Sequence, residues 1–303
     1  MTTGVFNYID PTTITRSGDT FVKPWSKVDV DKSSSKQTAR QRPVANLRDF
    51  PASSFGTDVS GFALFTSPGN EKDFTDDSAV RNGYYAEVEA LVRAKLPGVK
   101  KVVIFDHTIR RRIASSPRQP VQQVHVDQTP GAAEARVRRH VADPAEADEL
   151  LRGRYQIVNV WRPIGYPATD SPLALIDWRS TRPEDLVAVD LLYPVYREGY
   201  DGDDRGKEKL PDQTSIDSTE GYEVRGETYS VAPSDDHEFF YVKDMTPDEV
   251  LFLKCFDSRG HGFPGGVEGR ANCAPHTAFA DPATPPGTKG RQSIEVRCLV
   301  FYE

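Results

Sequence analysis

A histidine and an aspartate two positions apart, His125 and Asp127, stand in the short run Val124–Gln128. The run has the composition of a β-strand, and side chains two positions apart on a strand point to the same face. One metal ion can therefore bind between the imidazole and the carboxylate. Because isolated His-x-Asp pairs also occur at solvated strand ends, the hypothesis needs a third ligand.

The other histidines differ in how well they suit a third ligand position. His276 lies among apolar residues and is the best candidate. His261 lies in a glycine-rich run, where a mobile loop would hold a ligand with too little precision. His140 stands among charges and is expected to be a surface histidine. His107 stands at a strand end and is expected to be structural. Two histidines and one carboxylate form the facial triad of non-haem Fe(II) oxygenases, which leaves coordination positions open.

Length and composition restrict the class of protein. With 303 residues, 37% of them hydrophobic and 27% charged, the chain can bury a sizeable core in one large or two small domains. The formal net charge of −7 argues against a nucleic-acid partner, because phosphate binding needs a basic face. The sequence has no long apolar run and no signal-peptide core, so we expect a cytosolic protein without a membrane partner. The three cysteines are too widely spaced for a disulfide framework or a zinc knuckle and are expected to fill apolar positions: Cys255, Cys273 and Cys298.

Hydrophobic patterns predict a mainly β fold. Residues 1 to 45 are expected to form a loosely structured N-terminal arm, which can still pack on the body through the apolar anchors Val5-Phe6 and Phe21–Trp25. Helical spacing of apolar residues runs from 78 to 96, and an Ala/Glu/Arg-rich segment predicts one or two helices over 131 to 152, broken at Asp143-Pro144. Short β-type runs dominate elsewhere: 61–65, 99–109, 155–162, 173–178, 186–192, 223–231, 238–242, 250–256 and 293–302. Many short strands separated by Pro and Gly favour a β-sandwich or jelly roll decorated by helices.

Five motifs stand in an order that resembles a known family. They are His125–Asp127, Asn159–Pro163, Pro172–Arg179, Pro275–Phe279 and Arg291–Arg297, with the two histidines about 150 residues apart. Together they resemble the hydroxylase/desaturase family that includes a gibberellin desaturase, a cephem-methoxylase-associated protein and a fungal aziridine-forming oxygenase. The resemblance implies a double-stranded β-helix, a cupin-like jelly roll with helical insertions, as a single domain over residues 46–303. It also implies oxidation that uses Fe(II), 2-oxoglutarate and O₂, with iron bound by His125, Asp127 and His276.

In such an enzyme the distal carboxylate of 2-oxoglutarate needs a cationic partner. A guanidinium suits this role because its rigid fork can bind a carboxylate through two hydrogen bonds. Arg291 lies 15 positions after His276 in an Arg-x-Ser arrangement, with Ser293 beside it. Arg297 is the alternative, because both arginines alternate onto one strand face together with Ser293 and Glu295. The sequence leaves the choice open, with Arg291 preferred.

Three further residues lie on a strand expected beside the metal strand and are candidates for substrate contact: Asn159, Trp161 and Arg162. Alternatively, Trp161 packs in the core and Arg162 pairs with a buried carboxylate such as Asp177. The expected reaction is oxidation of an unactivated C–H of a small molecule in secondary metabolism, by hydroxylation, desaturation or a ring closure such as aziridine formation. A zinc hydrolase on the same barrel and a non-catalytic jelly-roll binding protein remain as alternatives.

Overall fold

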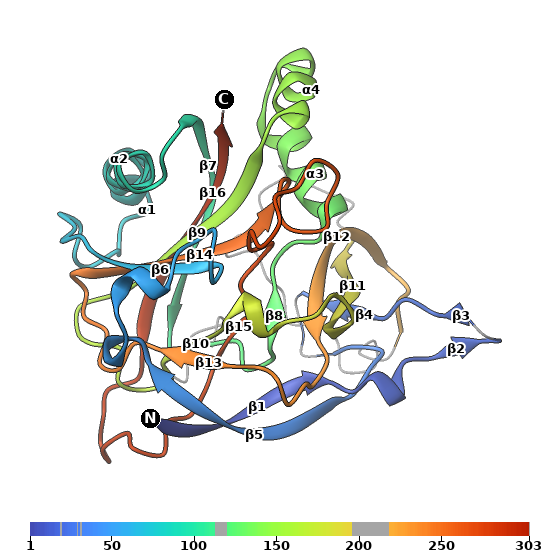
Figure 1. Cartoon of the computed structure of the whole chain (residues 1–303), viewed down its shortest axis with the longest axis horizontal. Coiled ribbons are helices and arrows are strands. Elements are labelled where there is room, and N and C mark those ends of the chain that lie inside the picture. Colours follow the sequence, from blue (N-terminus) through green and yellow to red (C-terminus); the bar gives the residue numbers. More distant parts are fainter. Residues whose placement is uncertain (19, 29, 31, 113–119, 196–217, 303) are drawn as a thin grey trace.

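The computed structural model describes residues 1–18, 20–28, 30, 32–112, 120–195 and 218–302, and two large β-sheets dominate it (Figure 1). The first has nine strands. In spatial order they are β1 (Thr2–Ile9), β5 (Gln37–Asn46), β13 (Phe239–Tyr241), β10 (Leu173–Ile176), β15 (His276–Ala278), β8 (His125–Val126), β12 (Tyr222–Val231), β11 (Leu186–Pro194) and β4 (Trp25–Lys27). The sheet contains both parallel and antiparallel pairs, and the two predicted histidine ligands lie on neighbouring strands at its centre.

The second sheet has five strands and packs against the first. Its spatial order is β6 (Phe62–Thr66), β14 (Glu249–Asp257), β9 (Tyr155–Pro163), β16 (Gln292–Tyr302) and β7 (Val99–Arg111). All residues of β9 and β14 are buried, so this sheet is covered on both faces. The fold is mainly β, as predicted, and is the curled jelly roll with flanking helices.

Successive residues of β9 point alternately to the two faces of this sheet. Val158 and Val160 pack on its outer face in one cluster with Val88 and Val92 of α2 (Tyr85–Lys95). That helix continues from α1 (Asp77–Ala79) through a π-helical turn over Val80–Tyr84, in agreement with the predicted helix. Trp161 points inward and packs with residues of β10 in the other sheet. The inner face is therefore the one from which side chains can reach the space between the sheets.

Two helices cover one end of the inner face, α3 (Pro130–His140) and α4 (Pro144–Arg152) (Figure 1). Each begins at a side-chain cap followed by proline, Thr129 for α3 and Asp143 for α4. The predicted break at Asp143-Pro144 is confirmed. Buried alanines and valines of both helices pack with Ile157, Leu299 and Phe301, so this end of the inner face is apolar.

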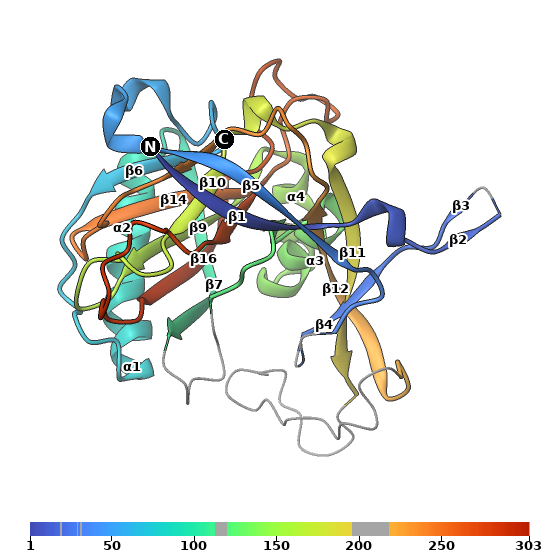
Figure 2. The ribbon, with the colours of Figure 1, turned by 90° about the horizontal axis from the view of Figure 1, so that it is seen from below.

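The prediction of a loosely structured arm over residues 1 to 45 is wrong. β1 pairs with β5 from Thr2 opposite Val44 to Ile9 opposite Gln37, and β5 pairs with β13. Phe6 lies in the core and stacks on Phe239 with 3.9 Å between ring centroids. The polar connection between β1 and β5 concealed the alternation of these strands. Among the described N-terminal strands, β2 (Arg16–Ser17) and β3 (Thr20–Phe21) stand away from the body (Figure 2).

β1 also supports the metal strand, because the Val124 amide donates to the carbonyl of Asn7 over 2.8 Å. β8 itself is shorter than the predicted run, and Asp127 follows its last residue. The three cysteines are buried and free, as predicted. Across the described residues, every helix is too short or too polar to cross a membrane.

A buried ion network joins β14 to the segment that leads into β15. Lys254, fully buried, donates to Asp257 and Asp58 over 2.7 Å each and to the Ala271 carbonyl over 3.0 Å. Arg154 donates to the same two carboxylates over 2.6 to 2.7 Å. Burial raises the pKa of Asp257, but the hydrogen bond from Arg154 and the charge of Lys254 outweigh burial and hold that pKa well below its usual range. The network thus fixes the start of the segment that carries His276.

We expect Lys254→Met to destabilise the protein by about 3–5 kcal/mol, because removing one partner of a buried ion pair leaves the other charge uncompensated. Urea unfolding at pH 7 measures this. The matched control is Lys101→Met, which removes the exposed ion pair with Glu146 and should cost about 1 kcal/mol or less.

The loss of unfolding free energy caused by Lys254→Met should also be smaller in acid. A depressed carboxyl pKa stabilises the folded state above the unfolded pKa of about 4, and this stabilisation is lost as the pH falls toward the folded pKa. Equal effects of Lys254→Met and Lys101→Met, or a deficit that does not change between pH 7 and pH 3, would contradict this account.

Candidate metal centre

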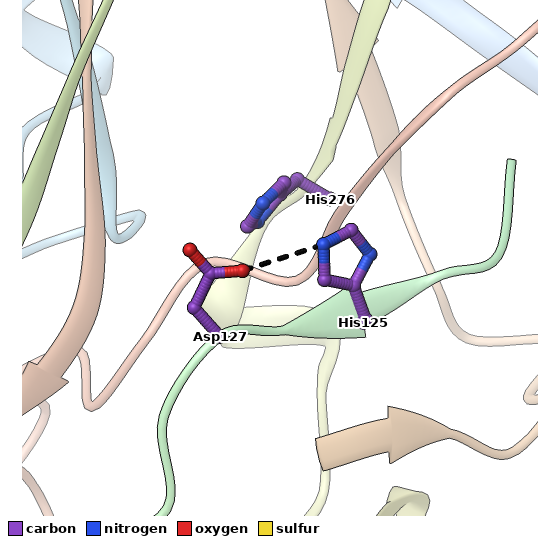
Figure 3. Close-up of side chains that lie close together, drawn as sticks. All are labelled: His125, Asp127 and His276. Atoms are coloured by element: carbon purple, nitrogen blue, oxygen red, sulfur yellow. Dashed lines mark ion pairs between the residues drawn. The ribbon is translucent and has the colours of Figure 1, made fainter. Parts of the chain in front are cut away.

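The three predicted ligands converge on one point. His125 on β8 and His276 on β15 stand directly opposite each other in the sheet, with 4.5 Å between their ring centroids. His125 Nε2 lies 3.4 Å from Asp127 Oδ1, and one ligand atom from each of the three residues lies within 4.8 Å of the others. Figure 3 shows the three side chains pointing toward one another. The structure therefore brings together two imidazoles and a carboxylate that could hold one metal ion.

Backbone hydrogen bonds fix both imidazoles in the tautomer that a metal ligand needs. His125 Nδ1 donates to the Gln123 carbonyl over 2.8 Å, and His276 Nδ1 donates to the Ala274 carbonyl over 3.0 Å. A carbonyl oxygen only accepts, so the proton lies on Nδ1 in each ring. The lone pair of Nε2 is then free to bind a metal ion, as in most histidine metal sites.

The electrostatic surroundings favour protonation states that suit metal binding. Burial, followed by the charge of His125, lowers the pKa of His276. Burial raises the pKa of Asp127, but the hydrogen bond with His125 and the charge of Arg297 outweigh it and lower that pKa well below its usual range. Burial lowers the pKa of His125, but the hydrogen bond with Asp127 outweighs burial, so the net effect is a raised pKa. A bound metal ion would therefore compete with a proton for this ring. His276 is neutral and Asp127 ionised at neutral pH.

The triad lies in the wall of a cavity between the two sheets. The other lining residues are Thr108, Arg110, Val121, Trp161, Leu173, Thr277, Ala278, Arg291, Ser293, Glu295 and Arg297. The charged residues that alternate along β16 therefore face the cavity, whereas such a pattern is normally the solvated side of a strand. Register explains how the wall is built: Ser293 stands opposite Arg110, Glu295 opposite Thr108, and Arg297 opposite Asn159.

The two arginines that the sequence could not separate have different surroundings. Arg291 is 2% exposed; its Nη1 donates to the Ser171 carbonyl over 2.7 Å, and its Nε has no partner. No carboxylate forms an ion pair with it among the described residues, and its guanidinium lies 5.4 Å from the centroid of the Trp161 ring. Burial and then the charge of Arg110 lower its pKa, although a guanidinium stays charged at neutral pH. A buried cation of this kind lacks an anion.

Arg297, in contrast, is fully engaged. It pairs with Glu295 over 2.7 Å and with Asp106 and Asp127 over 3.3 Å each. It also donates to the Thr108 hydroxyl over 2.9 Å. Its donors are used within the protein, which leaves Arg291 as the better partner for an added carboxylate.

The three candidate substrate-contact residues have different positions. Trp161 lines the cavity, and Asn159 lies beside the triad and donates to Asp127 over 2.8 Å. Arg162 points to the opposite face of β9, where its guanidinium lies 5.2 Å from the Tyr84 ring and donates to the Pro247 carbonyl. The structure does not bring it into the cavity. Nor does Arg162 pair with Asp177, whose carboxylate binds Arg179.

The other histidines considered from the sequence lie outside the triad. His261 pairs with Glu268 over 3.2 Å, and its ring packs against Trp178. His140 stacks on Phe105 with 5.0 Å between centroids and is partly buried. His107 contacts the Tyr85 hydroxyl over 2.7 Å, a structural role as expected.

The sequence analysis did not identify several lining residues of the cavity, among them Thr108 and Arg110 of β7. The signal for these two was the alternation Asp106, Thr108, Arg110, which matches the alternation on β16. Arg112, in contrast, pairs with Asp170 outside the cavity.

This donor set fits Fe(II) and 2-oxoglutarate. Two imidazoles and one carboxylate are the facial triad of non-haem Fe(II) oxygenases. Arg297 joins the Asp127 carboxylate of this triad to two further carboxylates, those of Asp106 and Glu295. Three carboxylates and one guanidinium leave two negative charges, which a divalent ion would balance. At another point of the same cavity, Arg291 offers a buried cation that forms no ion pair with a carboxylate of the described residues. Fold and site together define the class of Fe(II)- and 2-oxoglutarate-dependent oxygenases.

Comparisons with known proteins agree with this class. A family model described as an oxidoreductase/YMDC permease-like domain matches residues 6–301. Hydroxylase/desaturase efuI of Hormonema carpetanum is 31% identical over 265 residues, which are 82% of this chain and 79% of that protein. Fe(II)/2-oxoglutarate-dependent dioxygenase nvfI of Aspergillus novofumigatus is 31% identical over 228 residues, 75% of this chain and 69% of that protein. A solved structure of the iron and alpha-ketoglutarate-dependent endoperoxidase NvfI has the same fold, with a TM-score of 0.73 and 24% identity over 99% of this chain and 97% of that one.

The chain belongs to this oxidoreductase family and, within it, to the hydroxylase/desaturase group of Fe(II)/2-oxoglutarate-dependent oxygenases. The resemblance carried by its five motifs is thereby confirmed. It is an enzyme that uses Fe(II), 2-oxoglutarate and O₂ and acts on a small molecule. A zinc hydrolase or a non-catalytic jelly-roll protein is not favoured.

Proposed function

We propose that His125, Asp127 and His276 bind the Fe(II), and that Arg291, with Ser293 beside it, binds the distal carboxylate of 2-oxoglutarate. One observation carries the assignment: the converging triad and a buried guanidinium without an anionic partner line the same cavity. A buried charge without a partner is costly, so the bound cosubstrate would complete the site.

Each residue of the proposed site has a separate part in the mechanism. When bound, Fe(II) with 2-oxoglutarate and O₂ supplies the oxidising power for an unactivated C–H bond. The carbonyls of Gln123 and Ala274 keep the Nδ1 proton on each imidazole, so that Nε2 faces the ion. Arg291 orients the cosubstrate, and the apolar wall at Val121, Leu173 and Trp161 excludes water and positions the substrate.

The finer assignments rest on the relatives. Because relatives carry the names hydroxylase/desaturase and endoperoxidase, we propose oxidation of a small-molecule C–H in secondary metabolism, by hydroxylation, desaturation or ring closure. We also propose a cytosolic location. Since β1 and β5 belong to the same sheet as the triad, the proposed oxygenase domain includes the N-terminal strands.

We expect His276→Ala to abolish substrate-stimulated formation of succinate and to remove Mn²⁺ binding, because two ligands cannot hold the ion in place. His125→Ala and Asp127→Ala should behave in the same way. The matched control is His261→Ala, which removes a histidine outside the triad and should leave most of the activity. A fully active His276→Ala enzyme would disprove the metal assignment, and loss of Mn²⁺ binding in His261→Ala would transfer the role to that residue.

We expect Arg291→Gln to raise the KM for 2-oxoglutarate far more than the KM for the primary substrate. The cosubstrate carboxylate would lose a bidentate charge-assisted pair and stay underpaired in a buried site, at a cost of about 2–5 kcal/mol. This corresponds to a change of about 30-fold or more. Steady-state kinetics with each substrate varied in turn measures it.

Arg162→Gln is the matched control for Arg291→Gln, because it also removes a buried arginine, but on the outer face of β9. Its KM for 2-oxoglutarate should stay close to the wild-type value. If the KM for 2-oxoglutarate rises selectively in Arg297→Gln instead of Arg291→Gln, Arg297 is the residue that binds the distal carboxylate. If this KM rises in neither variant, 2-oxoglutarate is not the cosubstrate.

A further inference from the structure

The two oxygens of the Asp127 carboxylate have different surroundings. Oδ1 faces the Nε2 atom of His125 over 3.4 Å, on the side where the triad converges. Oδ2 points away from that side and accepts two hydrogen bonds, from the Asn159 amide over 2.8 Å and from Arg297 Nε over 3.3 Å. With both donors in place, turning the carboxylate would break two partly buried hydrogen bonds.

Both donors come from rigid strands of the opposite sheet. Asn159 on β9 and Arg297 on β16 stand opposite each other in register, and Asn159 is fully buried. Arg297 is held in turn by Asp106, Thr108 and Glu295. The pair therefore reaches across from the five-stranded sheet to the end of β8 in the nine-stranded sheet.

The unequal hydrogen bonding of Asn159 shows what orients its side chain. Its amide nitrogen donates to Asp127, whereas its Oδ1 is buried with no hydrogen-bond partner among the described residues. Buried polar atoms without partners are rare and costly. The contact with Asp127 thus determines the orientation of the Asn159 side chain. No hydrogen-bond network among the described residues satisfies both ends of its amide.

We propose that Asn159 and Arg297 are positioning residues that present a single oxygen of Asp127 to the metal ion and hold the other oxygen away from it. This inference rests on the proposed role of the triad. A carboxylate that bound through both oxygens would occupy one more coordination position, and the facial triad depends on open positions for the cosubstrate and O₂. Neither residue then contacts the substrate or the cosubstrate.

The geometry and the charge of Arg297 can be separated by substitution. Its three carboxylate partners and its own charge leave the cluster with two negative charges, which Arg297→Lys preserves. Lysine cannot reproduce the planar fork that bonds several groups at fixed angles. Asn159→Leu removes the other donor and keeps the same branching of side-chain heavy atoms. Each variant removes one of the two donors to Oδ2 while leaving all three ligands in place.

The test measures Mn²⁺ affinity of the full-length protein by calorimetry and the rise in Tm that saturating Mn²⁺ produces. In Asn159→Leu and in Arg297→Lys we expect affinity to fall by about 10–100-fold, the usual effect of losing a partner that orients a metal ligand. The Mn²⁺-dependent rise in Tm should shrink accordingly. Asn159→Ala serves as a second variant at that position should Asn159→Leu fail to fold.

The control is Tyr302→Phe, which removes a 2.6 Å hydrogen bond to buried Gln156 away from the triad. It should lower the Tm with and without Mn²⁺ and leave Mn²⁺ affinity unchanged, as any purely structural loss would. Wild-type Mn²⁺ affinity in both Asn159→Leu and Arg297→Lys would overturn the inference while leaving the proposed function intact. A wild-type protein that binds no Mn²⁺ would overturn the proposed function itself, and this inference with it.

Discussion

Charged side chains on the inner face of the five-stranded sheet are the constraint on which the site depends. Taking an ion out of water costs several kcal/mol unless a partner compensates it. Arg297 meets this condition within the protein, because three carboxylates surround it. Arg291 does not, although it is more deeply buried, with 2% of the residue exposed against 16% of the Arg297 side chain. Arg297 is therefore part of the structure of the site, whereas Arg291 is the arginine that can bind an anionic ligand.

Such a polar inner face is possible only because other parts of the sheet supply apolar burial. The outer face packs entirely against α2 and its flanking turns, and the far end of the inner face packs against α3 and α4. β9 and β14 are thus buried along their whole length, while the charged row on β16 faces the cavity. The buried network around Lys254 repeats the same principle at the start of the segment that leads to His276, where every charge has a partner.

The sequence predicted those parts of the site that depend on residue type and local spacing. His125 and Asp127 were found from strand periodicity, His276 from its apolar neighbours, and the described strands after residue 60, except β15, from short β-type runs. The arm over residues 1 to 45 was misjudged because its partner strand β13 lies almost 200 residues away. The roles of Asn159 and Arg297 could not be predicted for a similar reason. They depend on register between β9, β16 and β7, which no local pattern encodes.

The same arrangement bears on how one site can serve different oxidations. In the proposed assignment, the ion and the cosubstrate use the histidines, Asp127 and Arg291, while Asn159 and Arg297 are occupied with Asp127. The rest of the cavity wall includes the apolar side chains of Val121, Leu173, Ala278 and Trp161 beside the polar or charged Thr108, Arg110, Thr277 and Glu295. In this assignment the apolar side chains take no part in the chemistry and position the C–H bond of the substrate. Since a displacement of about 1 Å can change a rate by about 100-fold, the outcome of the reaction depends on the shape of this wall more than on the charged row beside it.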